Sequence, residues 1–158
     1  MENRIKILLE ENGKLPTLAS SGSVAYDLYI PEDTVINKGR QVIPLQFRLE
    51  LPHQYEAKIE ARSGFSLKGM QGYYPISGPY QSEHRYDADV LTGKIDSDYR
   101  GIVGVIIRSN EDKPFLLKEG TRIAQLSIYK VHTPGFEIVT ELSETERGEG
   151  GFGHSGTK

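Results

Sequence analysis

The chain has 158 residues, a formal net charge of -3 and no cysteine, which excludes a disulfide-stapled scaffold and a thiolate metal site. Acidic and basic residues are interleaved without a polybasic stripe, so the composition argues against nucleic-acid binding. The amino terminus is too charged for a signal peptide and no apolar run is long enough to cross a bilayer, so we expect a single-domain cytoplasmic protein without a membrane partner.

Short segments of alternating or continuous apolar residues recur along the chain and are separated by turn residues. Such alternation predicts half-buried strands. In chain order the expected strands are 5–9, 25–30, 34–36, 41–51, 55–61, 101–107 and 122–131. Helical periodicity is weak and leaves room for a turn or two. Many short strands between glycine and proline residues are typical of an all-β sandwich or jelly-roll-like barrel, which is the fold class we expect.

Two stretches, residues 69–89 and 147–158, do not show the strand pattern. The first is rich in tyrosine, glycine and proline, and the second contains five glycines between Gly148 and Gly156. Successive glycine amides can form a concave nest for phosphate. Most glycine-rich tails are disordered termini. A lone aromatic residue, Phe152, is unusual in a flexible linker and is suited to covering a base.

Three further motifs place polar groups at turns or strand ends. Arg62-Ser63-Gly64 follows a strand and is either a plain turn or a phosphate clamp of guanidinium, hydroxyl and amide. Residues 93–101 hold two carboxylates and a tyrosine between glycines, which indicates a hairpin with a polar tip or a solvated turn. Arg122 and Gln125 lie around the start of a strand. Asp27 lies inside an apolar strand and must therefore be paired, hydrated or near a cation.

In their order and combination these motifs resemble the five motifs of the trimeric dUTP pyrophosphatase (dUTPase) family, from Leu15 to the end of the chain. The most specific are Gly-Lys-Ile-Asp-Ser-Asp-Tyr-Arg-Gly at 93–101 and Arg-Gly-Glu-Gly-Gly-Phe-Gly at 147–153. The resemblance implies a jelly-roll-like (β-clip) domain over residues 1–146 and a homotrimer with shared active sites. It also implies that residues 147–158 form a flexible arm that completes the active site of a neighbouring subunit.

The activity that the resemblance implies is hydrolysis of dUTP to dUMP and pyrophosphate by attack of water on the α-phosphorus. This reaction limits uracil in DNA and supplies dUMP for thymidylate synthesis. By the same resemblance, Asp96 is the catalytic residue that positions the water, and Tyr99 packs under the deoxyribose. Mg²⁺ is the implied cofactor, chelated by the triphosphate and reached by Asp27 through coordinated water.

The resemblance assigns the remaining motif residues to substrate binding. Groups that pair with the uracil edge are implied at Val90, Gly93 and Ile95, and Phe152 is implied to stack on the uracil. The implied phosphate-binding residues are Arg62, Ser63, Gly64, Gln125, Arg147, Gly153 and Ser155.

The sequence departs from the family pattern at several positions. Ala25 stands where the first motif usually has glycine, which is tolerable if φ is negative there. Ala61 stands where proline is common, and His154 where the arm commonly has serine. The largest departure is an insertion at about 70–88, between the phosphate motif and the uracil hairpin.

We expect the insertion to be ordered, to extend the neighbouring hairpin and to pack near the site or the three-fold interface. There it would offer a surface for a protein partner, and the alternative is a tolerated surface excursion. Two other functions stay open. One is a dCTP deaminase-like enzyme of the same fold, which needs a different second motif and a catalytic glutamate. The other is a nucleotide-binding regulatory homologue.

Overall fold

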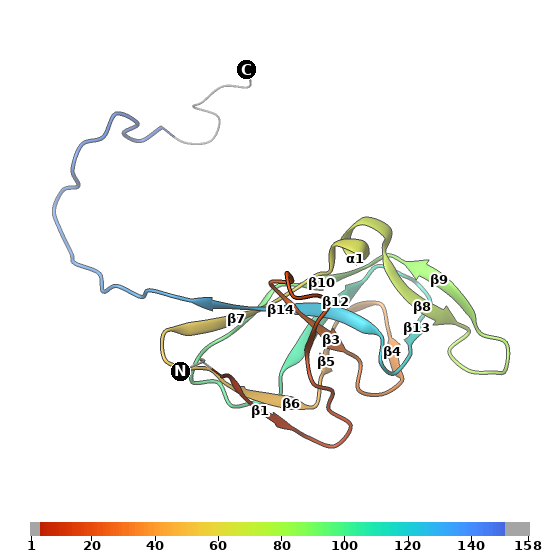
Figure 1. Cartoon of the computed structure of the whole chain (residues 1–158). Helices are drawn as coiled ribbons and strands as arrows, with labels where there is room; N and C mark the ends of the chain where they lie inside the picture. The colour runs from red at the N-terminus through yellow and green to blue at the C-terminus, as the bar shows by residue number, and fades with distance from the viewer. Residues whose placement is uncertain (1–3, 151–158) are drawn as a thin grey trace.

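The structure is a computed structural model that describes residues 4–150 (Figure 1). Strands dominate it, and its helix α1 (Ser63–Lys68) is short. The strands are β1 (Lys6–Leu9), β2 (Thr17–Leu18), β3 (Tyr26–Tyr29), β4 (Thr34–Ile36), β5 (Gly39–Pro44), β6 (Phe47–Glu50), β7 (Tyr55–Glu60), β8 (Met70–Tyr74), β9 (Ser82–Tyr86), β10 (Ala88–Leu91), β11 (Gly93–Ile95), β12 (Gly104–Ser109), β13 (Phe115–Leu117) and β14 (Arg122–Lys130). Within residues 4–150 no helix is long and apolar enough to span a membrane.

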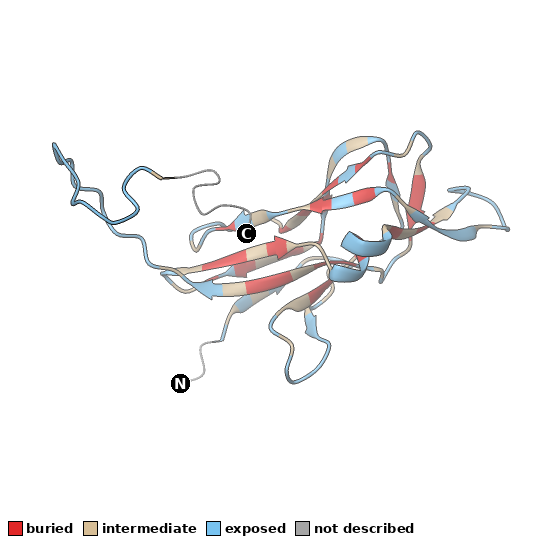
Figure 2. Ribbon diagram, turned by 90° about the horizontal axis from the view of Figure 1, so that it is seen from above, coloured by how far each residue is buried: buried red, intermediate tan, exposed pale blue. Residues whose placement is uncertain are grey.

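The strands form antiparallel sheets that enclose one apolar core, as the jelly-roll-like, all-β prediction requires. The largest sheet has the order β11-β7-β14-β3-β2, and the others are β4-β13-β8-β9, β10-β12-β5 and the pair β1-β6. Buried residues lie along strands of the neighbouring sheets and alternate with less buried ones in the longer strands, such as β5 and β12 (Figure 2). Hydrophobic side chains of all four sheets contribute to this core, which therefore fixes the strand ends that carry polar groups.

Most of the predicted strands are confirmed, and one is divided. The predictions for 34–36, 55–61 and 122–131 correspond to β4, β7 and β14. The predicted strand 41–51 is interrupted because Gln46 has a φ of 56°. At this break the chain changes sheets, since β5 pairs with β12 whereas β6 pairs with β1. Alternation of side chains continues across the break and conceals it in the sequence.

The prediction that residues 69–89 lack strand structure is wrong, because they contain the hairpin β8–β9. Met70 pairs with Tyr86 and Gln71 with Arg85, and β8 also joins β13. Met70 is fully buried. Gly72 is required at its position, since a methyl group there would lie 2.6 Å from the ring of Phe115. The insertion is therefore a hairpin in a different sheet from β11, and it does not extend the turn at 93–101.

The hairpin predicted for residues 93–101 also has a different form. β11 pairs with β7, whereas β12 pairs with β10 and β5. The two strands that flank the 93–101 stretch and pair with each other are therefore β10 and β12. The polar tip is a loop that crosses from one sheet to another, with β11 added to the edge of the largest sheet.

Phe115 ties the inserted hairpin to the core, and its removal is expected to destabilise the fold. Its side chain is fully buried and its ring stacks on Tyr86 with centroids 4.1 Å apart. Phe115→Ala is expected to lower the free energy of unfolding by about 3–5 kcal/mol. Tyr80→Ala, a matched control at the exposed tip of the same hairpin, is expected to change it by less than about 0.5 kcal/mol. Urea denaturation measures both, and equal losses would contradict the docking of the hairpin.

Candidate functional site

A cavity of about 540 Å³ lies where α1 meets the ends of β3, β7 and β14, and we call it the α1 cavity. Five of the predicted site residues line it. They come from three motifs that are far apart in the sequence and that the fold brings together: Asp27, Arg62, Ser63, Gly64 and Gln125.

Strand register explains why these residues meet. Gln125 on β14 is paired with Asp27 on one side and with Glu60 on the other, so the three side chains form a row across three strands. Alternation along β14 then brings Ser127 and Tyr129 to the same cavity. The sequence prediction did not include these two residues, although the period of two along 122–131 would have found them.

Asp27 is paired, as its position in an apolar strand predicts. It is only 8% exposed, and its carboxylate receives Arg62 Nε at 3.0 Å and Arg122 Nη1 at 3.4 Å. The Arg62 guanidinium also lies over the ring of Phe65, with its central carbon 5.7 Å from the ring centroid. These contacts hold Arg62 at the wall of the cavity, and a planar guanidinium in a fixed position is suited to binding phosphate.

The first turn of α1 adds backbone donors to the same wall. The helical hydrogen bonds begin with the N–H of Phe65, which donates to the carbonyl of Arg62 at 2.9 Å. The amides of Ser63 and Gly64 precede that bond and are not used inside the helix. A methyl group built on Gly64 would meet no protein atom within 4 Å. The chain itself therefore does not require glycine at this position, whereas close approach of a ligand to the backbone would.

Asp96 lies far from Arg62, which is at the α1 end of the cavity of the same chain. Ile95 is paired with Ala57 on β7, so Asp96 comes next to Glu56, at the opposite end of that strand from Arg62. Six residues of extended chain separate Glu56 from Arg62, which corresponds to about 20 Å. A group that orients a nucleophile must lie within hydrogen-bonding reach of it. Asp96 and Arg62 of one chain therefore cannot act on the same phosphorus atom.

Charged neighbours surround Asp96 on the surface of the sheet. Lys94 Nζ lies 2.6 Å from Glu56 Oε2. Hydrogen bonding to Lys94 lowers the pKa of the Glu56 carboxyl below its usual value. The same contact with Glu56 raises the pKa of Lys94, and the charge of Asp96 raises it further. Asp96 itself is exposed. Its carboxylate is thus presented on the surface beside a permanent cation.

Tyr99 and the backbone of β10 and β11 flank Asp96. The Tyr99 hydroxyl donates to the carbonyl of Ile102 at 3.0 Å and its ring lies against Gly101, while 45% of the residue stays exposed. The side chains of Val90 and Ile95 are buried in the core. Only their backbone groups can therefore reach a ligand. A methyl group at Gly93 would meet nothing within 4 Å, which leaves room beside this backbone.

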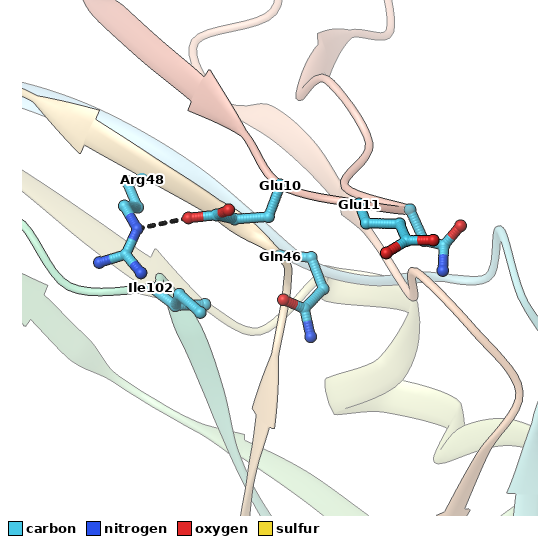
Figure 3. A pocket seen from close by; sticks show the side chains of 6 residues that line it. Glu10, Glu11, Gln46, Arg48 and Ile102 are labelled. Atoms are coloured by element: carbon cyan, nitrogen blue, oxygen red, sulfur yellow. Dashed lines mark hydrogen bonds and ion pairs between the residues drawn. The ribbon is translucent and has the colours of Figure 1, made fainter.

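A second cavity, of about 380 Å³, lies between the turn after β1, the Gln46 bend and Ile102 (Figure 3). Arg48 Nε binds Glu10 Oε1 at 2.6 Å, and Arg48 Nη1 donates to the carbonyl of Arg100 at 2.9 Å. The guanidinium thus joins the turn after β1 to the loop between β11 and β12. Since the only guanidinium among the described residues that line this cavity, that of Arg48, is already bound to Glu10 and to the loop, it is not free to bind a phosphate.

The predicted residues of the carboxyl-terminal arm are only partly described. Arg147 is exposed, and its Nε donates to the carbonyl of Gly150 at 2.6 Å. Phe152, Gly153 and Ser155 lie outside the described residues, as does the departure at His154. Residues 131–150 contain no helix or strand and lead away from the sheets (Figure 1).

The other two departures fit the structure. Ala25 is not among the non-glycine residues with positive φ, so its methyl group is tolerated. It lines the α1 cavity beside Asp27. Ala61 continues the extended chain between β7 and the N-cap of α1, Arg62. Neither substitution removes a polar group from the cavity wall.

Residues 4–150 contain no group of three histidine, cysteine, aspartate or glutamate side chains that could hold a metal ion. The donor chemistry at the α1 cavity is compatible with Mg²⁺ in a different manner. Two carboxylates, Asp27 and Glu60, border the cavity. Mg²⁺ commonly binds to one or two carboxylates, several waters and substrate phosphate oxygens.

The fold is that of an all-β protein, and one wall of its α1 cavity carries guanidinium, hydroxyl and amide donors, the groups that suit an oxyanion. The profile of the dUTPase family matches residues 11–73 and 71–156, and the chain belongs to this family. The two matched ranges meet within β8, where the insertion begins.

Similar proteins cover almost the whole chain. The deoxyuridine 5′-triphosphate nucleotidohydrolase of Solanum lycopersicum is 38% identical over 94% of this chain and 78% of its own length. That of Clostridium tetani is 37% identical over 98% of both chains. Among solved structures, the dUTPase of Staphylococcus bacteriophage 80alpha with dUpNHpp has a TM-score of 0.80 and 26% identity, covering 98% of this chain and 99% of its own.

Proposed function

We propose that this chain is a dUTP diphosphatase, which hydrolyses dUTP to dUMP and pyrophosphate. The observation that carries this function is the α1 cavity, where the fold gathers Asp27, Gln125 and the Arg62–Gly64 motif. Relatives named deoxyuridine 5′-triphosphate nucleotidohydrolase match nearly the full chain, which supports the same substrate. A dCTP deaminase-like activity has no comparable support.

In the proposed mechanism the chain acts mainly by positioning and by stabilising charge. Arg62, Ser63 and Gly64 bind the phosphates, with Gln125 assisting. Asp96 accepts a hydrogen bond from a water molecule and takes its proton as the water oxygen bonds to the α-phosphorus. The bond from the α-phosphorus to the bridging oxygen breaks, and pyrophosphate leaves with that oxygen.

Mg²⁺ would be held by triphosphate oxygens and, through water, by Asp27. When bound, it supplies neutralisation of the charge that develops on the phosphates. On the nucleoside side, backbone groups near Val90, Gly93 and Ile95 pair with the uracil edge. Tyr99 occupies the space that a ribose 2′-hydroxyl would need.

The active site is proposed to be shared within a homotrimer. The separation of about 20 Å between Asp96 and Arg62 along β7 supports this, because one chain cannot bring both groups to the same phosphorus atom. Phe136 and Ile138, in the segment after β14, are fully exposed in the single chain. In the proposed trimer a neighbouring subunit would cover these apolar side chains. An apolar cavity of about 440 Å³, lined by Ile5, Ile7 and other apolar residues, offers a surface for this contact.

Residues 1–146 are proposed as the β domain and residues 147–158 as the arm that completes a neighbouring site. In that arm Phe152 would stack on uracil, and Arg147, Gly153 and Ser155 would contact phosphates. The reaction would limit uracil in DNA and supply dUMP for thymidylate synthesis, in the cytoplasm. The 70–88 insertion is also proposed to bind a protein partner.

A substrate panel with Mg²⁺ tests the proposed function. Pyrophosphate release from dUTP is expected to exceed that from dCTP, dTTP and UTP by about 10³-fold or more in kcat/KM, because mismatched substrates leave buried polar groups unpaired or clash with Tyr99. Chelation by EDTA is expected to abolish the activity and Mg²⁺ to restore it. Release of ammonia from dCTP would instead establish a deaminase, and binding of dUTP without turnover would establish a regulatory homologue.

A further inference from the structure

The β8–β9 hairpin is fixed at its base and presents a polar face to the α1 cavity. Met70 and Tyr86 are paired and turn toward the core, where Tyr86 stacks on Phe115. Side chains alternate between the two faces of a strand. The next pair, Gln71 and Arg85, therefore points to the opposite face, and both residues line the α1 cavity. The insertion thus adds a guanidinium to the wall.

Arg85 is anchored at the edge of the cavity without being neutralised there. Its Nη1 donates to the carbonyl of Gly69 at 3.3 Å, which leaves its remaining N–H groups for another acceptor. The cavity has two other cations, Arg62 and Lys68, and two carboxylates, Asp27 and Glu60. Arg62 is bound to Asp27 at 3.0 Å. Arg85 and Lys68, in contrast, form no ion pair with any described residue.

We propose that Arg85 binds the pyrophosphate part of the nucleoside triphosphate, with Lys68 beside it. This inference rests on the proposed function. The backbone assigned to the uracil edge, at Gly93 and nearby residues, does not line the α1 cavity. The cavity therefore holds the phosphate end of the substrate. An uncommitted guanidinium at that end meets a polyanion and forms charge-assisted hydrogen bonds to it.

The test compares Arg85→Gln with Arg40→Gln, which makes the same change of charge at an exposed site on β5 that does not line the cavity. Arg85→Gln is expected to raise the KM for dUTP about tenfold. It is also expected to raise the Kd for inorganic pyrophosphate, measured by calorimetry, about tenfold. The inhibition constant of dUMP, which lacks the pyrophosphate part, is expected to change less than about twofold. Arg85→Lys should give intermediate values, because it keeps the charge but not the fork.

The outcomes separate this inference from the proposed function. If the parent protein hydrolyses dUTP and Arg85→Gln has the same KM for dUTP and the same Kd for pyrophosphate as Arg40→Gln, the role of Arg85 is overturned and the proposed function is not. A parent protein that does not hydrolyse dUTP would overturn the proposed function, while pyrophosphate binding would still decide the role of Arg85. An equal loss of dUMP binding would place Arg85 at the α-phosphate and also contradict the inference. Thermal unfolding at an unchanged temperature confirms that each variant is folded.

Discussion

Asp96→Asn is expected to lower kcat for dUTP by about 10³-fold or more, because the amide cannot take a proton from the attacking water. The side chains have nearly the same size, and Asp96 is exposed on a surface loop, so folding should be unaffected. Binding of a non-hydrolysable dUTP analogue should be retained. Pyrophosphate release and calorimetry with the analogue measure the two effects separately.

Asp98→Asn is the matched control for Asp96→Asn. Asp98 is exposed on the same loop, two residues further along, and loses the same charge in the variant. It should retain kcat within about threefold, which corresponds to less than 1 kcal/mol. Equal losses of kcat in the two variants would show that catalysis depends on the negative charge of the loop and not on Asp96 as a general base. An active Asp96→Asn enzyme would refute the assignment.

Truncation after Glu146 is expected to leave the proposed assembly intact and to lower kcat/KM for dUTP by about 100-fold or more, since the proposed stacking by Phe152 and the proposed phosphate contacts of the arm are lost together. The β sheets and their core end at Lys130, so the truncation removes no part of them. Analytical ultracentrifugation and pyrophosphate release measure the two properties.

Phe152→Ala refines the truncation experiment. If the arm covers the base with this ring, the single substitution should account for part of the loss and act mainly on KM. A full-length chain with a scrambled order of residues 147–158 controls for composition and length. A truncated protein with the kinetics of the full chain would show that residues 147–158 take no part in the reaction.

The sequence predicts the strands that have long alternating patterns but not the places where the chain changes direction or sheet. β7 and β14 each have several alternating residues, and the core enforces that alternation. The break at Gln46 depends on one positive φ within a continuous pattern. β13 has three consecutive buried residues, which is too short a pattern to show a period. The strands of the inserted hairpin have polar residues on both faces and resemble a loop.

The motif residues of the α1 cavity could be predicted from the sequence, because each carries its chemistry in a local pattern. Their meeting depends on register, with Gln125 placed between Asp27 and Glu60. Arg85 could not be predicted as a cavity residue, since the pairing of β8 with β9 determines the face on which it lies. The separation of Asp96 from Arg62 likewise follows from the pairing of β11 with β7 and not from their spacing in the chain.

The most direct test of a site shared between subunits is complementation. Arg62→Gln and Asp96→Asn chains, each expected to be inactive alone, are co-expressed in equal amounts so that they assort at random into the proposed trimers. If Arg62 and Asp96 of one site come from different subunits, about one site in four receives both native residues and regains activity. A mixture that releases no more pyrophosphate than the two variants measured separately would contradict a site shared between subunits.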